Sequence, residues 1–588
     1  MTDTNTKTNS GISRRKFITG AVGSAAVLGA VTTLMPGVAA ATPAGVRAAL
    51  AGTGTRAQPT AQVPTTWSQS ADVVVVGYGG AGSITAITAF DNGANVLVLE
   101  KTPQVPTSSY PFGTKYPISG GGGSTMMSNA GTWQVPGSFW TEDVAHLYNG
   151  SWGSTPQSVI QAFLEVASDT DAWETKMGIK HTLSQAPASP TPGSSEDPGL
   201  GPSQWQSLGT VDHGPQFFYA LDQQVLSRKI PVLFNTTATD LIQDPTTKEV
   251  LGVQALQNSS EVLNIQAKKA VVLATGSCEF NEDMKKAWMR AYPVHFYGWP
   301  YATGDGIKMA QKVGADLWHT NTFFGRGTPW FPNLPSGWIC TAPPGNNYIL
   351  VDKHGNRYTS ETGPSHAQVY RMTDIDLVAD EYSRIPSFYI FDETTRKAGP
   401  FGSSIMGVGV LPPQLGGPTT AWSSDNSAEI AKGWIFKAND IPTLAAAISA
   451  APIPAYFPGT GPNGVDTITV SIDPNVLSTT VNNYNAACAV GVDTQFGRTA
   501  STLKQIQTPP YYAIPLWPGG CNTEAGPVRN AKCQVCDPDG NAIPRLYEAG
   551  EMGGIFGFFY EGGGEMTQII VSGRIAGNNA TAETAWTS

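Results

Sequence analysis

The chain has 588 residues, of which 40% are hydrophobic and 14% are charged. One simple hydrophobic core rarely supports a chain of this length, so we expect two or more domains. A formal net charge of −10 argues against a nucleic-acid partner, because such partners are bound by basic surfaces. An aromatic content of 10% argues against a disordered chain.

The spacing of cysteine and histidine residues predicts no metal site and no covalent haem. The 6 cysteines include one Cys-x-x-Cys, formed by Cys533 and Cys536, without a second pair at zinc spacing. A disulfide or plain packing is the favoured interpretation of these two thiols. The haem-attachment motif Cys-x-x-Cys-His does not occur in the sequence.

Residues 1–41 have the layout of an export signal. The pair Arg14 and Arg15 follows a polar leader, and a weakly apolar stretch at 18–38 precedes small residues typical of a signal-peptidase site. Paired arginines mark the twin-arginine route, so we expect delivery to the periplasm or to the outer face of the cell membrane. Residues 42–70 are predicted to form a linker.

The alternative interpretation of this segment is a transmembrane anchor, since its apolar stretch is about long enough to span a bilayer. Its Gly, Ala and Thr content makes it a poor anchor, and the small-residue site favours cleavage. We therefore expect no stable membrane insertion after processing.

Features that bind a dinucleotide occur in order within about thirty residues. A β-branched strand is expected at 71–76, a glycine-rich turn at 77–82 and a helical stretch at 83–92. A second apolar strand at 95–99 is followed by Glu100. A glycine motif alone is weak evidence, but this order of strand, turn, helix, strand and acid predicts a Rossmann-type βαβ unit.

Each glycine of the motif has a physical role in such a unit. Gly77 allows the tight turn, Gly79 lets the backbone approach a pyrophosphate, and Gly82 lets helix and strand pack closely. The helix N-terminus stabilises phosphate charge, and Glu100 can accept hydrogen bonds from ribose hydroxyls. The predicted cofactor-binding residues of this unit are Gly77, Gly79, Gly80, Ala81, Gly82, Glu100 and Lys101.

Later segments continue this pattern. Residues 268–276 predict a strand that enters an Ala-Thr-Gly turn, and residues 302–310 contain Ala-Thr-Gly-Asp-Gly. Residues 543–551 run into a glycine-rich segment before a helix predicted at 567–579. The first glycine loop by itself does not decide between FAD and NAD.

Together these segments resemble the flavoprotein family of fumarate reductases, 3-ketosteroid Δ1-dehydrogenases and related exported enoate reductases. The resemblance covers about 71–588 and is strongest at 72–101, 268–321 and 505–579. It implies FAD as the cofactor, held by the first βαβ unit and by the C-terminal segment.

The resemblance also implies the fold. We expect an α/β protein with a Rossmann-like FAD-binding domain in two pieces, 71–322 and 502–588. An inserted α+β capping domain is expected at 323–501. Helical patterns at 441–451 and 474–490 agree with a helix-containing cap.

By resemblance, further residues contact FAD. Glu551 is expected near the ribityl chain or the pyrophosphate. The backbone of Gln568 and Ile569, at the start of the last helix, is expected to face the flavin carbonyl edge, where a helix N-terminus favours the anionic reduced flavin. The remaining predicted cofactor-binding residues are Ala238, Thr275, Gly276 and Asp305.

The substrate site departs from that of fumarate reductases, which surround a dicarboxylate with arginines. Tyr560 stands where one such arginine is expected, and Asn522 stands where a carboxylate-binding histidine is expected. The ketosteroid dehydrogenases have Tyr-x-x-x-Gly at this place, which Tyr560 and Gly564 match. In that group the hydroxyl and the glycine N–H hold the substrate carbonyl, and such donors stabilise an enolate. The alternative is that Tyr560 is only a packed aromatic residue.

The proton donor departs from the family pattern as well. The family places it four residues after a glutamate that corresponds to Glu361, and this position is Ser365. Serine is a poor proton donor by itself, but the adjacent His366 has an ordinary pKa near neutrality and can act as an acid. The alternative is that His366 is a surface histidine without a catalytic role.

These features predict an exported FAD-dependent oxidoreductase acting on a CH–CH or C=C bond conjugated to a carbonyl, with an unsaturated carbonyl compound as substrate. We expect a separate electron donor or acceptor, such as a cytochrome or a quinone-linked carrier. The alternatives are a dehydrogenase similar to the ketosteroid enzymes and, in another class, an FAD electron-transfer subunit without a substrate of its own.

Overall fold

The computed structural model describes part of the chain within one compact unit, Pro43–Ser588. The described residues are 61–135, 140–187, 206–340, 343–362, 368–456, 466–557 and 562–586. The predicted export signal lies outside them.

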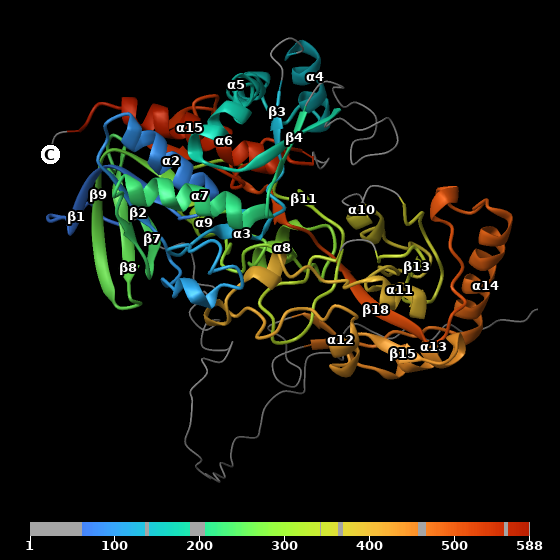
Figure 1. The fold of residues 1–588 in the computed structure, drawn as a ribbon. Helices are drawn as coiled ribbons and strands as arrows, with labels where there is room; N and C mark the ends of the chain where they lie inside the picture. Colours follow the sequence, from blue (N-terminus) through green and yellow to red (C-terminus); the bar gives the residue numbers. More distant parts are fainter. Residues whose placement is uncertain are drawn as a thin grey trace, which may run out of the picture. The chain divides into compact units, whose positions relative to one another are not determined.

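A mostly parallel sheet contains the strands β1 (Gln69–Val76), β2 (Val96–Leu99) and β9 (Glu261–Leu273), which lie at the left of Figure 1. Its parallel strands lie in the order β22 (Ala542–Glu548), β9, β1, β2 and β6 (Val232–Leu233). The last four residues of β1 are all valines, and each is buried. A short β-branched run buried on both faces is typical of a central parallel strand. The predicted α/β fold class is confirmed.

Antiparallel strands extend this sheet. The hairpin of β7 (Thr236–Gln243) and β8 (Val250–Gln257) joins the first half of β9, because Gly252 pairs with Gln266 and Gln257 with Glu261. At the other edge, β21 (Gln534–Cys536) pairs antiparallel with β22.

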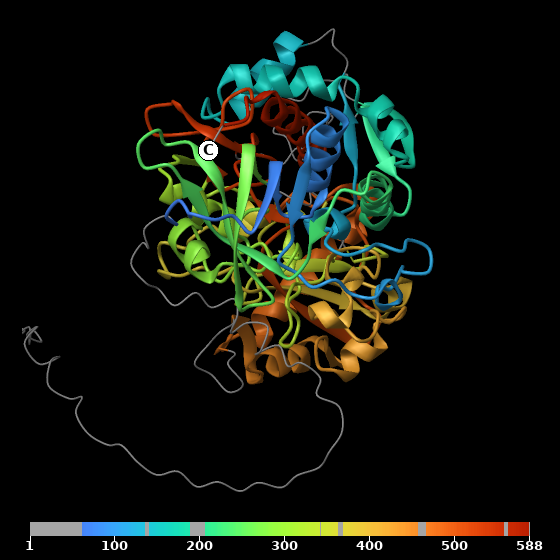
Figure 2. The same ribbon diagram turned by 90° about the vertical axis from the view of Figure 1, so that its left-hand side faces the viewer.

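Two helices pack side by side against the parallel sheet: α2 (Gly80–Asp91) and α15 (Gly564–Ala582) (Figure 2). Small residues on α15 allow this close approach. A Cβ atom at Gly573 would lie 2.9 Å from Ile84 Cγ2, and one at Gly577 would lie 2.8 Å from Thr88 Cβ. The C-terminal helix is thereby held against the first βαβ unit, which is far away in the sequence.

A second, antiparallel sheet contains β12 (Gly327–Thr328), β18 (Tyr511–Pro518), β14 (Ser387–Asp392) and β13 (Tyr348–Val351), and β15 (Phe436–Ala438) also pairs with β18. β18 follows residue 502 in the chain. One strand of this sheet therefore comes from the segment that the sequence analysis assigns to the C-terminal part of the FAD-binding domain. The domain boundaries at 322 and 502 remain a prediction.

The two cap helices lie close to where the sequence predicts them. α13 (Ile441–Ala450) begins after Asp440, whose side chain accepts a hydrogen bond from the N–H of Thr443 at 2.7 Å. α14 (Pro474–Val490) begins with a proline and ends before a glycine at 491 in the left-handed conformation. Aspartate caps, first-turn prolines and a C-terminal glycine are common helix boundary signals, which explains the agreement.

The remaining elements connect and cover these two sheets. They are α3 (Gly123–Met127), β3 (Thr132–Gln134), α4 (Trp140–Gly150), α5 (Gln157–Ala167), α6 (Thr170–Met177), β4 (His181–Pro187), β5 (Gln206–Thr210), α7 (His213–Ser227), α8 (Glu282–Trp288), α9 (Asp305–Lys312), β10 (Leu317–Trp318), β11 (Phe323–Phe324), α10 (Gln368–Met372), α11 (Glu393–Ala398), α12 (Ser427–Ala431), β16 (Ile453–Tyr456), β17 (Asp466–Ile468), β19 (Asn522–Thr523) and β20 (Gly526–Pro527). In the described part of the chain, we find no helix with the length and apolar character that a membrane span requires.

Candidate cofactor and active site

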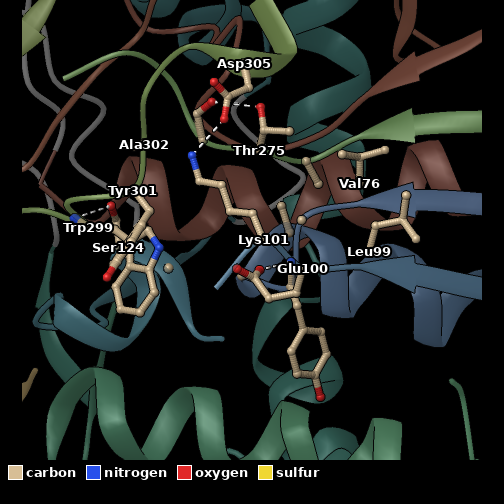
Figure 3. A pocket seen from close by; sticks show the side chains of 18 of the residues that line it. Val76, Leu99, Glu100, Lys101, Ser124, Thr275, Trp299, Tyr301, Ala302 and Asp305 are labelled. Carbon is tan, nitrogen blue, oxygen red and sulfur yellow. Dashed lines mark hydrogen bonds and ion pairs between the residues drawn. The ribbon is translucent and has the colours of Figure 1, made fainter. Parts of the chain in front are cut away.

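A cavity lies at the carboxyl ends of the parallel strands β1 and β2 (Figure 3). This is the edge at which open α/β sheets bind ligands. The cavity is lined by predicted residues from segments far apart in the sequence: Gly77, Gly79, Gly80, Ala81, Glu100, Lys101, Ala238, Thr275, Gly276, Asp305, Glu551 and Ile569. Two further predicted residues, Gly82 and Gln568, lie beside it without lining it.

The glycines of the first loop differ in what surrounds them. A Cβ at Gly77 would lie 2.3 Å from the Ala274 carbonyl oxygen, and one at Gly82 would lie 2.0 Å from the Gly77 carbonyl oxygen. At Gly79 the nearest protein atom would be the Gly123 Cα at 3.7 Å. Gly77 and Gly82 are therefore required by the packing of the protein itself, whereas Gly79 leaves space that a ligand can fill.

The N-terminus of α2 is suited to a phosphate. The helix begins after Gly79, which provides no side-chain cap for the first turn. The N–H of Gly80 donates to Thr125 Oγ1 at 3.2 Å, and the next two N–H groups of the first turn have no partner within the helix. Unpaired N–H groups and the helix dipole together stabilise an anion at this place.

Glu100 is held in a fixed orientation at the end of β2. Its Oε2 accepts the N–H of Tyr78 at 2.9 Å, and its Oε1 accepts the N–H and the hydroxyl of Thr102 at 2.8 Å and 2.7 Å. Each carboxylate oxygen can accept two hydrogen bonds, so Oε2 retains one free position. That position is available to a ribose hydroxyl, as the βαβ pattern predicts.

Lys101 points away from Glu100 and toward Asp305 (Figure 3). Its ammonium nitrogen lies 2.7 Å from Asp305 Oδ2 and 2.7 Å from Thr303 Oγ1. Burial acts to raise the pKa of the Asp305 carboxyl, but the Lys101 ammonium more than offsets it, and the net pKa is lowered. Asp305 is therefore ionised at neutral pH and holds a positive charge at the cavity wall.

The last helix begins earlier than predicted. α15 starts at Gly564 and not near residue 567, because Gly563 adopts a left-handed φ of +96° directly before it. The unpaired first-turn N–H groups are therefore those of residues 564–566. Gln568 and Ile569 lie one turn further along, so the expectation that they form the helix N-terminus is corrected.

The side chains of these two residues have different surroundings. Ile569 lines the cavity. Gln568 is buried, with its Oε1 accepting the Ile555 N–H at 2.9 Å and its Nε2 donating to the Gly550 carbonyl at 2.7 Å. Gln568 thus ties the helix to the segment that carries Glu551.

Several cavity residues were missed by the sequence analysis. Trp299 and Tyr301 line the cavity with ring centroids 5.6 Å apart, and the N–H of Trp299 donates to Ser124 Oγ at 3.2 Å (Figure 3). Gly120–Gly123 precede Ser124, and all four glycines have positive φ. This second glycine run is the sequence signal that could have located this wall of the cavity.

The predicted catalytic residues Tyr560, Ser365 and His366 lie outside the described residues. Gly564 is described, and a Cβ there would lie 2.6 Å from Phe556 Cζ. Only glycine therefore fits at the first position of α15 without rearrangement.

Glu361, which precedes the predicted acid, belongs to a buried network of charges. Arg357 donates to both of its oxygens, at 2.8 Å and 2.7 Å, and Arg498 Nη1 lies 3.3 Å from Oε2. Arg357 also contacts Asp493 at 2.7 Å. These ion pairs hold Glu361, which is four residues before Ser365 in the sequence, in a fixed position.

Asn522 itself brings no positive charge to a dicarboxylate, although Arg326 lies near enough to act on the neighbouring Cys521 thiol. Asn522 is buried, and its Nδ2 donates to Glu524 Oε1 at 3.0 Å. Arg529 lies further along the same segment, but its guanidinium is paired with Glu548 at 2.7 Å.

Cys533 and Cys536 are free, buried thiols. Of the two interpretations from the sequence, packing therefore describes them and a disulfide does not. Within the described ranges we find no group of three or more histidine, cysteine or acidic side chains placed to hold a metal.

Comparisons with known proteins agree with this geometry. The family described as FAD binding domain matches residues 72–566. NADH:fumarate oxidoreductase from Klebsiella pneumoniae is 26% identical over 530 residues, which are 87% of this chain and 48% of that protein. The chain thus spans about half the length of that relative.

A second relative is covered almost completely. Vinyl phenol reductase from Lactiplantibacillus plantarum is 27% identical over 537 residues, which are 88% of this chain and 97% of that protein. Among solved structures, 3-ketosteroid Δ1-dehydrogenase from Sterolibacterium denitrificans shares the fold with a TM-score of 0.69 at 19% identity, covering 88% of this chain and all (100%) of that chain.

The free phosphate-binding helix end, the fixed acid at the end of β2 and the open space at Gly79 all fit FAD. With the family match over most of its length, this chain belongs to the FAD binding domain family, and its cofactor is FAD.

Proposed function

We propose that this protein is an FAD-dependent reductase of carbon–carbon double bonds conjugated to a carbonyl group. The observation that carries the proposal is that one helix reaches both the cofactor cavity and the Tyr-x-x-x-Gly segment. α15 lines the cofactor cavity through Ile569 and begins at Gly564, the glycine of Tyr-x-x-x-Gly. The two residues are five positions apart, or about 7.5 Å at ~1.5 Å per residue.

Bound FAD would supply the hydride for the β-carbon of the substrate. The chain's own residues would then handle the carbonyl and the proton. The N–H of Gly564 and the hydroxyl of Tyr560 hold the carbonyl oxygen, where negative charge develops. One such donor accelerates reactions of this kind by roughly 10²–10³-fold. His366, or Ser365 assisted by it, protonates the α-carbon.

The substrate is proposed to carry no second carboxylate. Tyr560 and Asn522 replace the cationic residues expected of fumarate reductases, and Arg529 is neutralised by Glu548. The similarity to vinyl phenol reductase over nearly all of that protein supports a neutral, unsaturated substrate. Electrons would come from a separate carrier, such as a cytochrome or a quinone-linked protein.

The fold of 3-ketosteroid Δ1-dehydrogenase and the shared Tyr-x-x-x-Gly favour a second candidate, the reverse reaction on a saturated ketone. The two candidates differ in direction: the reductase oxidises its own reduced flavin with an alkene, whereas the dehydrogenase reduces its oxidised flavin with a saturated ketone. An electron-transfer subunit without a substrate would do neither.

The test uses the purified FAD-loaded protein, reduced anaerobically and mixed in a stopped-flow instrument with an enone, a cinnamate-type acid, 4-vinylphenol or fumarate. We expect rapid flavin reoxidation by at least one neutral alkene and a saturated product by mass spectrometry, with fumarate slower. If none of the alkenes reoxidises the flavin, the proposal fails. Reduction of the oxidised protein by a saturated ketosteroid would establish the dehydrogenase instead.

We also propose that residues 1–41 direct export by the twin-arginine route. The support is the Arg14–Arg15 pair followed by a weakly apolar stretch and small residues. Replacing both arginines by lysine should leave the uncleaved precursor in the cytoplasm, as seen by cell fractionation and immunoblotting. Unchanged export of that variant would mean that another route operates.

A further inference from the structure

We propose that Glu279 and Glu551 form a proton-holding pair beside the cofactor cavity, in which Glu279 keeps a resident proton and Glu551 gains one when FAD is reduced. The proposal rests on FAD binding and does not depend on which substrate is reduced.

The hydroxyl cluster around Thr523 has room for a proton on Glu279. Glu279 Oε2 lies 3.1 Å from Thr523 Oγ1, which lies 2.7 Å from Ser277 Oγ, and the Ser277 hydroxyl lies 2.7 Å from the Ala525 carbonyl oxygen. The N–H of Cys278 donates to the same Thr523 oxygen at 3.2 Å. In the arrangement in which Ser277 donates to the Ala525 carbonyl and Thr523 donates to Ser277, the single hydroxyl proton of Thr523 is used, and Glu279 is the donor in its contact with Thr523.

The surroundings of Glu279 agree with the neutral form. Its side chain is fully buried, in the loop between β9 and α8. Its Oε1 has no hydrogen-bond partner, and we find no lysine or arginine paired with it in the part of the chain that the structure describes. Burying an unpaired carboxylate is costly, so such a group keeps its proton.

Glu551 is the carboxyl that links Glu279 to the cavity. It lines the cavity from the segment after β22, and its negative charge adds to burial in raising the pKa of Glu279. The two loops flank the same strand segment, because Ser277 Oγ and the N–H of Gly553 both donate to the Ala525 carbonyl, at 2.7 Å and 3.4 Å.

The electrostatics of the pair explain how it divides its protons. Burial and the nearby Glu551 raise the pKa of Glu279 well above its usual range. Burial raises the pKa of Glu551 to about 7, so this carboxyl changes its charge near neutral pH. The other titratable groups near the pair are Cys278, Cys521, Glu524 and Glu565, and the cations that act on these groups are Lys285, Arg326 and Arg529. Lys285 is paired with Glu282, and Arg529 is paired with Glu548.

Reduction of FAD would shift this balance. Two electrons from an external reductant place negative charge in the cavity, and a like charge nearby raises the pKa of a carboxyl. About one pH unit above the Glu551 pKa of about 7, this carboxyl is mostly ionised while FAD is oxidised and becomes protonated once FAD is reduced. The proton comes from solvent water and forms an O–H bond on a Glu551 oxygen. Protonation of Glu551 thus neutralises one of the two negative charges that the electrons bring into the cavity.

The experiment measures proton uptake during anaerobic reduction of the FAD-loaded protein by dithionite, with a pH-indicator dye in weak buffer about one pH unit above the Glu551 pKa. We expect the wild-type protein to take up as much as one further proton per FAD compared with Glu551→Gln. A control variant at an exposed position, Glu261→Gln, should behave as wild type. Equal proton uptake by wild type and Glu551→Gln, with FAD bound in both, would overturn the proposal.

A second measurement tests Glu279 and requires no substitution of a residue that lines the cavity. Redox-difference infrared spectra of the wild-type protein should contain a protonated-carboxyl C=O band that is perturbed when FAD is reduced. This band should be lost in Glu279→Gln, whose amide can still donate to Thr523, and should be retained in Glu261→Gln. A spectrum unchanged in Glu279→Gln would contradict the resident proton. Neither measurement includes an alkene, so failure of the proposed reductase activity would leave both outcomes unaffected.

Discussion

The ammonium nitrogen of Lys101 lies 2.7 Å from Oδ2 of Asp305, which ties the end of β2 to the start of α9 at the wall of the cofactor cavity. The two residues are more than two hundred positions apart in the chain, yet both line the same cavity. The pair holds a positive charge where the phosphates and sugars of FAD are expected, while α2 presents its unpaired N–H groups nearby.

Lys101→Met should weaken FAD binding, because the cavity loses its charged donor and Asp305 is left as an unpaired anion. A hydrogen bond involving a charged group contributes about 1.5–3 kcal/mol, so we expect roughly 10–100-fold weaker affinity. Titration of apo-protein with FAD, followed by flavin fluorescence, measures this change. Lys312→Met is the matched control, because Lys312, on the same helix as Asp305, pairs with Asp240 at 3.0 Å and does not line the cavity. Equal effects of both substitutions would contradict a role for Lys101 in binding.

Gly79→Ala and Gly82→Ala should separate ligand binding from packing. A Cβ at Gly79 meets no protein atom closer than 3.7 Å, so this variant should fold normally but bind FAD poorly, since the methyl group enters the ligand's space. A Cβ at Gly82 would lie 2.0 Å from the Gly77 carbonyl oxygen, so that variant should unfold at a lower temperature even without FAD. Thermal unfolding of the apo-proteins and FAD content after purification distinguish the two. Full FAD content in Gly79→Ala would show that the pyrophosphate lies elsewhere.

Tyr560→Phe should lower kcat for an identified substrate by about 10²–10³, because one hydrogen bond to the developing oxyanion is lost while the ring remains. FAD content and thermal stability should stay unchanged. His366→Ala should instead alter the pH profile of turnover if this histidine is the acid. The two effects should not add if both residues act on one transition state. A near wild-type rate for Tyr560→Phe would mean that the tyrosine only packs and that other groups hold the carbonyl.

His181 should make stability depend on pH. Its hydrogen bond with Glu174, together with the contact to Asp171, raises the pKa of the imidazole from 6.5 to about 9 despite partial burial. The ring nitrogens lie 3.0 Å from Glu174 Oε2 and 2.7 Å from Asp171 Oδ1. The stabilisation is fully present below about pH 6.5 and is lost as pH rises through about 9. His181→Gln should therefore unfold at a lower temperature than wild type at pH 7, with the difference shrinking toward pH 9 and above. A difference that is constant over this range would contradict the ionic contribution.

The first βαβ unit could be predicted from the sequence because its determinants are local. The four valines at 73–76, the glycines that follow and Glu100 all act within about thirty residues, and each has a physical role that depends on its immediate neighbours. The cap helices were predicted for the same reason, since the aspartates and glycines that bound them lie beside them in the chain.

Other features depend on contacts between distant segments, which no local pattern contains. Trp299 joins the cavity wall through Ser124, and Glu279 contacts Thr523, which is more than two hundred positions away in the chain. The start of α15 depends on the left-handed backbone of Gly563, and the sequence alone offered several glycines for that role. The sequence by itself thus determined a dinucleotide-binding unit and the first half of the cofactor site, because those residues are contiguous. Only the tertiary structure decided which distant polar groups share protons and charge, because burial and partnership arise when segments hundreds of residues apart are packed together.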